Sequence, residues 1–458
     1  MSLARRTLAL YAMPVAGLTA MHWLVLMYLL KFSTDVLGIP AAMVGTLFAL
    51  ARVWDAVSDP LVGWWSDRTR SPLGRRRPWM FAAALPLGLS YFALWTPPAT
   101  ASPALVVVWL AVFLWLFYTT QTCFSIPHIS LGAELSPDPH ERTRVSGARV
   151  AADTLGIVPA IAVLHWLETS DSTRDVAALA AAGIGCVTTL LIVYGALRVE
   201  EPKAHQTAPI AANPFRALLD VARNPHAVRI TIVLLLCEVG MGSLLVAIPY
   251  IGVVTGQPGE SASMLVRFIV PFALAITPWI VVARRIGKQR AWVIACVSTA
   301  ASFSGLGFAA EFALWLVPFV IVGVGIGHAG MRILGPSVKA DVIDWDEART
   351  GERKEGTYFA AWNLVDKLGG ALSVAIVGFA IDAPGGGIDP EGVKFVTSVL
   401  PAGFTFAAAL VLMRFGLDAR AHAAVRREIE AREHATARVA QANPTFGRPP
   451  VAVGRAPG

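Results

Sequence analysis

Residues 41–65 read AAMVGTLFALARVWDAVSDPLVGWW, and residues 66–79 continue as SDRTRSPLGRRRPW. The first part is an apolar run long enough to cross a hydrocarbon core, which takes about 20 residues in a helix. Two aspartates, Asp55 and Asp59, interrupt that run, and five arginines follow it. Because basic loops stay on the cytoplasmic side of a membrane, the stretch predicts a spanning helix with acids inside it and a cytoplasmic end.

Eleven further segments share this apolar character. Hydrophobic residues make up 55% of the 458 residues and charged residues only 15%, with a mean hydropathy of +0.59, whereas a globular domain carries roughly 25% charged residues. We therefore expect an all-α, multi-pass protein with 12 transmembrane helices, embedded in the lipid bilayer of a bacterial inner membrane. The predicted helices span residues 8–31, 41–65, 79–96, 104–127, 145–167, 176–197, 227–253, 262–283, 291–310, 312–337, 357–381 and 393–417.

The net charge of +7 would also suit a nucleic-acid partner. The arginines, however, fall in short clusters between apolar runs and leave no basic domain that could bind a duplex. We expect no nucleic-acid partner, and we assign the charge to contact with the anionic cytoplasmic leaflet. Four cysteines lie singly in apolar segments without a CxxC pair, which argues against a disulfide framework or a metal site.

The connections between the apolar segments alternate between basic and non-basic. This alternation predicts that both termini lie in the cytoplasm. The longest connection, residues 198–226, contains four prolines and separates two predicted six-helix halves, 1–197 and 227–417. Residues 418–458 are predicted to form a cytoplasmic tail.

A faint internal repeat agrees with two halves. Residues 132–144 read GAELSPDPHERTR after the fourth predicted helix, and residues 340–353 read ADVIDWDEARTGER after the tenth. Each places an acid, Glu134 or Asp341, ahead of a Glu-Arg pair that ends in Arg142 or Arg353. Parallel six-helix repeats would produce this correspondence.

The spacing of Asp55 and Asp59 is i, i+4, so both carboxylates project from one face of a helix. Two like charges within a membrane are costly unless a cation lies between them or one is protonated. The pair therefore predicts a site for Na⁺ or H⁺. In the alternative interpretation, Asp59 caps the helix or pairs with Arg52.

The stretch GWWSDRTRSPLGRRRP at residues 63–78 resembles the loop between helices 2 and 3 in the major facilitator superfamily. Together with residues 132–144 and 340–353, it resembles the glycoside–pentoside–hexuronide:cation symporter family. The resemblance implies a major facilitator fold, with two six-helix bundles around a central cavity and alternating access between two sides of the membrane. Lysolipid transporters of animals share the signature, so it does not identify a substrate.

The resemblance also implies roles for individual residues. It makes Asp55, Asp59 and Thr122 cation ligands, and it places Ser58 where sodium-using members often carry Asn. Because an amide carbonyl is a better hard ligand than a hydroxyl, this substitution favours H⁺ over Na⁺. Arg149 and Lys367 match the interior cations of the family, and each is expected to pair with the acids when no ion is bound.

At the positions expected to contact substrate, the sequence departs from the family pattern. Sugar-carrying members hold galactoside hydroxyls with two acids, but the matching positions here are Thr19 and Ser125. Without those charge-assisted bonds a galactoside is disfavoured. Three interior cations remain, which favours a small solute with an anionic group. In the alternative interpretation, Asp153 pairs with Arg149 and Glu238 or Asp366 pairs with Arg332 or Lys367, which leaves no free positive charge. The predicted substrate-binding residues are Thr19, His22, Ser125, Arg149, Arg332 and Lys367.

Charged residues beyond the helix ends are predicted to form a network that gates the carrier. These are Asp67, Arg68, Arg75, Arg76, Glu134, Arg142, Asp341 and Arg353. A second local hypothesis is that Asp153 pairs with Arg149, four residues earlier on the same helix.

No phosphate-binding glycine loop, metal-ligand cluster or nucleophile elbow is evident in the sequence. We therefore expect no enzyme activity and no cofactor beyond the coupling ion. The sequence predicts a monomeric, cation-coupled symporter for a glycoside or a related small solute. Two alternatives remain, namely a carrier of an amphiphile such as a lysolipid, and a membrane sensor that binds a solute without moving it.

Overall fold

The computed structural model describes residues 3–136, 138–199, 201, 221–255, 259–351, 354–383, 387–417, 421–429 and 431. Twelve helices in this part of the chain are long and apolar enough to cross a membrane, which confirms the predicted number. The first six are α1 (Arg5–Lys31), α2 (Ala41–Arg68), α3 (Arg77–Trp95), α4 (Pro103–Glu134), α5 (Pro139–Thr169) and α6 (Thr173–Arg198). The other six spans comprise α8 (Pro225–Ala247), α10 (Ser261–Ile286), α11 (Lys288–Phe312), α12 (Val317–Thr350), α13 (Glu355–Ala380) and α15 (Leu400–Met413), with the short α9 (Ile251–Thr255) and α14 (Pro390–Lys394) at span ends.

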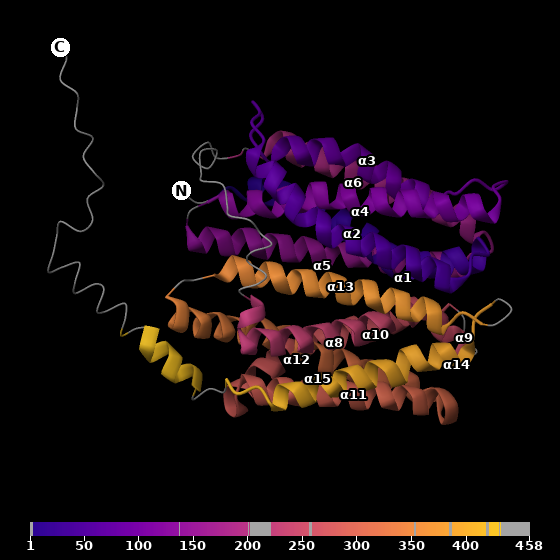
Figure 1. Cartoon of the computed structure of the whole chain (residues 1–458). Coiled ribbons are helices and arrows are strands. Elements are labelled where there is room, and N and C mark those ends of the chain that lie inside the picture. The colour runs from indigo at the N-terminus through magenta and orange to yellow at the C-terminus, as the bar shows by residue number, and fades with distance from the viewer. Residues whose placement is uncertain are drawn as a thin grey trace, which may run out of the picture.

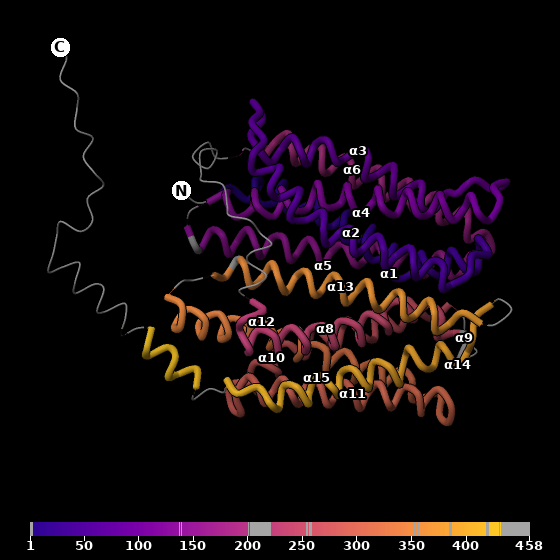
Figure 2. The backbone as a smooth tube through the Cα atoms, in the orientation of Figure 1, coloured from indigo at the N-terminus to yellow at the C-terminus, as the bar shows by residue number. Residues whose placement is uncertain are grey.

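The helices form two layers that differ in sequence position. Helices α1–α6 make the N-half and α8–α15 make the C-half, and Figure 1 shows them as separate bundles lying along each other. Figure 2 shows α13 running along the side of the C-half that faces the N-half. That helix packs against α2 of the N-half. The order of the elements therefore agrees with two six-helix bundles.

Several helices extend beyond their predicted ends. The prediction ended the fourth helix at residue 127 and the tenth at 337, but α4 continues to Glu134 and α12 to Thr350. As a result, Glu134 and Asp341 are helical, although the prediction placed them in connections. Arg142 is helical as well, because α5 begins at Pro139, before its predicted start. A hydropathy pattern locates only the part of a helix inside the hydrocarbon core, so it misses polar turns that project past the membrane.

Polar contacts join the two halves at one end of the bundle. The Thr34 hydroxyl, just after α1, lies 3.1 Å from the Tyr250 hydroxyl, just after the end of α8. The Ser261 amide at the start of α10 donates to Oε2 of Glu168, near the end of α5, over 3.2 Å. Because α1, α5 and α8 all end here, this is the end opposite Arg75 and the other arginines that follow α2. We call it the far end.

Close packing joins the halves at the same far end. Near the start of α2 and the end of α13, a Cβ on Gly45 would lie 3.2 Å from the Cα of Gly378, so glycine lets the two helices approach closely. One buried apolar cluster includes N-half residues such as Leu30 and C-half residues such as Ile248 and Val374. The other end of the C-half has a separate apolar cluster of its own, which contains Trp292 and Trp362.

Candidate functional site

Four polar side chains meet where α2, α4 and α13 adjoin. The Lys367 ammonium of α13 lies 2.9 Å from Oδ2 of Asp55 and 2.6 Å from Oδ2 of Asp59. On the other side of the carboxylates, Oγ1 of Thr122 lies 2.7 Å from Oδ1 of Asp55 and 3.1 Å from Oδ1 of Asp59. The structure therefore brings together two acids and a threonine of the N-half and a base of the C-half. We call these four residues the aspartate cluster, namely Asp55, Asp59, Thr122 and Lys367.

The aspartate cluster is balanced in charge by a second base. Nη1 of Arg52 lies 3.4 Å from Oδ2 of Asp55, and its guanidinium lies over the Tyr118 ring, 5.1 Å from the ring centre. Two carboxylates thus oppose two cations in a region where Asp55 is buried. A monovalent cation that bound to both carboxylates would add a third positive charge. Such an ion and the Lys367 ammonium must therefore compete for the same oxygens.

Local helix geometry accounts for most of this arrangement. Asp55 and Asp59 are one turn apart on α2, which places both carboxylates on the face toward Thr122. Ser58 is buried beside them, but its hydroxyl donates to the main-chain carbonyl of Asp55 over 3.1 Å. Its role as a cation ligand stays a prediction. Asp59 does not act as a helix cap, because α2 continues to Arg68.

On α1 and α5, the structure corrects one predicted pair. Asp153 does not pair with Arg149, because Oδ1 of Asp153 accepts a hydrogen bond from Oγ1 of Thr19 at 2.5 Å. Within the described residues Arg149 forms no hydrogen bond or ion pair, and its Nε is buried without a partner. An acid is therefore present beside Thr19 after all. It comes from α5 and not from α1.

The two remaining N-half candidates are on α1 and α4. Nδ1 of His22 lies 3.4 Å from Nε2 of Gln121. Ser125 is half-buried and one turn beyond Thr122 on the same helix. In the part of the chain that the structure describes, its hydroxyl makes no hydrogen bond. Their roles in substrate binding remain predictions.

In the C-half, Arg332 pairs with an acid, as the alternative interpretation held, and it is not a free cation. Its Nη1 on α12 lies 3.2 Å from Oε1 of Glu238 on α8, in a pair with about half of the arginine side chain exposed. Sequence spacing could not show this pair, because the partners are 94 positions apart. Of the three interior cations, only Arg149 has no anionic partner within the described residues.

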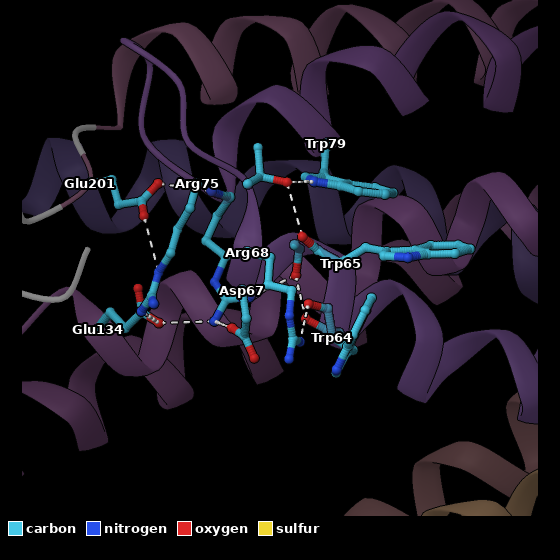
Figure 3. Close-up of polar contacts among 12 residues, drawn as sticks. Trp64, Trp65, Asp67, Arg68, Arg75, Trp79, Glu134 and Glu201 are labelled. Carbon is cyan, nitrogen blue, oxygen red and sulfur yellow. Dashed lines mark hydrogen bonds and ion pairs between the residues drawn. The ribbon is translucent and has the colours of Figure 1, made fainter. Parts of the chain in front are cut away.

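At the end of the N-half opposite the far end, a buried network joins four elements. Nη2 of Arg75 lies 2.8 Å from Oε1 of Glu134 at the end of α4, and Nη2 of Arg76 lies 3.2 Å from the same oxygen. Arg76 also pairs with Asp67 of α2, and its main-chain amide donates to Oε2 of Glu201 over 3.0 Å. Figure 3 shows Asp67, Arg75, Glu134 and Glu201 converging between the helix ends. These contacts form a charge network in the N-half, and its role in gating stays a prediction.

Two residues assigned to this network lie outside it. The Arg68 guanidinium lies over the ring of Trp64, 3.6 Å from the ring centre, as Figure 3 shows beside the network. Arg142 donates from Nε to the main-chain carbonyl of Ser136 over 2.9 Å. The network instead includes Glu201, just beyond the end of α6, which sequence reasoning missed because it lies 125 positions from Arg76.

The C-half has a simpler counterpart at the same end. Nζ of Lys288, at the start of α11, lies 2.8 Å and 3.0 Å from the two carboxylate oxygens of Asp341. His422 lies 3.0 Å from Oδ2 of Asp344. Arg353, predicted to belong here, lies outside the described residues. Glu134 and Asp341 therefore occupy corresponding positions in the two halves. Glu134 contacts Arg75 and Arg76, which follow the second span, and Asp341 contacts Lys288, which follows the eighth span.

Residues 10–419 match the family of MFS/sugar transport proteins. The chain belongs to this family. It is accordingly a major facilitator transporter and a multi-pass inner-membrane protein, as its 12 spans indicate.

Curated relatives of this transporter are symporters or transporters by name. The isoprimeverose transporter of Lactiplantibacillus pentosus is 28% identical over 79% of this chain and 77% of its own. The inner membrane symporter YicJ of Escherichia coli is 27% identical over 78% of each chain. The human sodium-dependent lysophosphatidylcholine symporter 1 is 28% identical over 80% of this chain and 74% of its own.

Solved structures confirm the fold. A D-xylose–proton symporter superposes with a TM-score of 0.69 at 14% sequence identity, over 90% of this chain and 97% of that one. At this identity the likeness concerns the fold alone.

Proposed function

We propose that this transporter is a cation-coupled symporter of a glycoside, with its cation site at Asp55 and Asp59. The observation that carries the proposal is Lys367, whose ammonium contacts both carboxylates from the opposite half. A bound Na⁺ or H⁺ would take over the negative charge that Lys367 now neutralises, and it would free the lysine from the interface. Binding of the ion thereby changes a contact between the halves, which is what coupling requires.

The positions of the contacts between the halves support an inward-facing conformation. Besides the contacts of Lys367 in the middle of α2 and α13, the polar contacts of Thr34 with Tyr250 and of Ser261 with Glu168 join the halves at the far end. The networks around Glu134 and Asp341, at the opposite end, each stay within their own half. If the arginines after α2 face the cytoplasm, the far end is extracellular and is closed.

A cysteine-labelling experiment tests that orientation. Thr100 follows α3 at the far end, and Pro72 lies in the loop that carries the arginines. In intact cells a membrane-impermeant maleimide should label Thr100→Cys and leave Pro72→Cys unlabelled. The wild-type chain, with its four native cysteines, gives the background. The reverse labelling pattern would invert the topology.

A glycoside fits the interior better than an anion. Charge neutralisation of Arg332 by Glu238 and of Lys367 by the aspartates removes most of the positive excess that favoured an anionic solute. The Asp153 carboxylate, beside Thr19, supplies an acceptor for sugar hydroxyls of the kind that we expected to be missing. The similarity to a lysophosphatidylcholine symporter keeps an amphiphile as the second candidate.

Transport by purified protein tests the proposal. Reconstituted into liposomes, the transporter should concentrate labelled isoprimeverose when a Na⁺ or H⁺ gradient is imposed and release it when an ionophore collapses that gradient. Labelled lysophosphatidylcholine serves as the competing substrate. Binding of isoprimeverose without accumulation would identify a sensor, and transport of the lysolipid alone would identify an amphiphile carrier. Serine at position 58 favours H⁺, and strict dependence on Na⁺ would contradict that preference.

A further inference from the structure

A partly open cavity of about 240 Å³ lies in the C-half and is lined by residues of α8, α11, α12 and α13. Its lining includes Glu238, Arg332, Lys339 and Asp366, and none of the aspartate cluster. We propose that this cavity is a solute subsite, in which Lys339 and Asp366 together bind the hydroxyl groups of one sugar ring. The inference rests on the proposed function, because it names where that solute binds in the C-half.

Lys339 is the first reason for the assignment. The residue is only 8% exposed, yet its ammonium forms no hydrogen bond or ion pair with any described residue. It lies over the ring of Trp362, 5.4 Å from the ring centre. A buried charge without hydrogen bonds is costly. An acceptor that enters the cavity would therefore bind Lys339 with little competition from the protein.

Asp366 is the second reason, and it is independent of the first. Its Oδ1 is buried and has no hydrogen-bond partner among the described residues. His328 and Trp292 line the same cavity, and their ring nitrogens Nδ1 and Nε1 are likewise buried without a partner among the described residues. Native proteins satisfy the large majority of their buried polar atoms. Several unsatisfied atoms around one cavity therefore indicate a place that a polar ligand completes.

The charges around the cavity specify what kind of ligand fits. Two carboxylates, Glu238 and Asp366, face two cations, Arg332 and Lys339, so the formal charge of this lining is zero. An anion bound to Lys339 would meet the unpaired oxygen of Asp366, and a cation bound to Asp366 would meet Lys339. A hydroxyl can donate to a carboxylate and accept from an ammonium. A neutral polyhydroxylated ring satisfies both.

The size of the cavity points the same way. At about 240 Å³ it is smaller than the roughly 300–1,000 Å³ of pockets that enclose drug-sized ligands. This volume has room for one small polar ring, and a lysolipid would have to leave its acyl chain outside the cavity. Because Asp366 and Lys367 are consecutive on α13, one helix carries both the proposed sugar contact and the ammonium of the aspartate cluster.

Binding of isoprimeverose to purified protein, measured by calorimetry, tests the subsite. Asp366→Asn and Lys339→Gln should each raise the dissociation constant about tenfold or more, because each removes a hydrogen bond to a charged group. Lys394→Gln is the matched control, since that lysine pairs with Glu391 on α14, outside the cavity. It should leave the dissociation constant unchanged. Unchanged binding in both cavity variants would overturn the subsite.

A second measurement needs no change to the cavity charges. Cys237 lines the cavity, whereas Cys186 is exposed on α6 of the other half. Saturating isoprimeverose should slow alkylation of Cys237 by N-ethylmaleimide, read by peptide mass spectrometry, and leave Cys186 as an internal control. Equal rates with and without the sugar would overturn the subsite.

The failure of this inference can be told from the failure of the proposed function. If the wild-type protein neither binds nor accumulates isoprimeverose, both are wrong as stated. If it accumulates the sugar but the cavity variants bind normally and Cys237 is not protected, only the subsite is wrong. If those variants change the pH dependence of uptake without changing binding, the cavity serves protons and the subsite is again wrong.

Discussion

The two halves of this transporter each contain an interior cluster of charges, and the clusters differ in how they are satisfied. In the N-half, Asp55 and Asp59 are contacted by Thr122 and by Lys367, a residue that reaches in from the other half. In the C-half, Glu238 and Arg332 pair with each other, while Lys339 has no polar partner within the described chain.

This difference separates two ways of using charge inside a membrane. A cluster satisfied by the opposite half links ion binding to the interface, because any ion must first displace Lys367. A cluster that lies within one half and keeps unsatisfied groups can bind a polar ligand without opening the interface. The first arrangement suits coupling and the second suits recognition. Four predictions test this comparison.

The largest effect is expected at the aspartate cluster. Asp55→Asn and Asp59→Asn should each abolish accumulation of isoprimeverose in liposomes under an ion gradient, because the lost carboxylate binds the coupling ion. Exchange of internal for external sugar should survive better, since it needs no net ion movement. Asp35→Asn is the control, because Asp35 forms an exposed pair with Lys31. Concentrative uptake by either cluster variant would refute the cation site.

The next effect concerns Lys367 as a competitor for the ion. Lys367→Gln should raise the apparent affinity for the coupling ion by about tenfold or more, because two charge-assisted contacts no longer oppose it. The maximal uptake rate should fall, because the carrier without bound ion would have to change conformation with two carboxylates that Lys367 no longer neutralises. The ion dependence of the initial rate of sugar uptake measures both quantities. An unchanged ion affinity would show that Lys367 does not compete.

A third prediction compares the networks at the ends of the halves. Glu134→Gln should destabilise the protein by roughly 1.5–3 kcal/mol, because it removes the buried carboxylate that Arg75 and Arg76 share and leaves Arg75 with Glu201 and Arg76 with Asp67. Asp341→Asn should cost about 1 kcal/mol or less, since the Lys288 side chain is 43% exposed and solvent can replace the lost contact. Thermal unfolding of the two variants in one detergent gives the difference. Equal losses would mean that burial does not separate the networks.

The smallest effect is expected at Arg332. Because Glu238 already neutralises this arginine in a partly exposed pair, Arg332→Gln should weaken the binding of a glucoside and of the matching glucuronide alike, by about 1 kcal/mol or less. Calorimetry with both sugars makes the comparison. A loss of more than about tenfold for the glucuronide alone would restore the idea that Arg332 binds an anionic solute.

The sequence by itself determined the 12 spans, the two-half organisation of the helices and the face of α2 that carries Asp55 and Asp59. Each of these follows from local rules, namely the length of an apolar run and the rise and turn of a helix. The same rules set Arg52 close to Asp55. The proximity of Thr122 came only from the family resemblance, because nothing local relates α4 to α2.

Only the tertiary structure decided which charges meet across helices. It paired Arg332 with Glu238, gave Asp153 to Thr19 instead of Arg149, and added Glu201 to the arginine network. It also left Lys339 and Asp366 around one cavity without partners. These contacts join residues from separate helices, and their geometry depends on how those helices pack. Sequence spacing within a single helix carries no information about that packing.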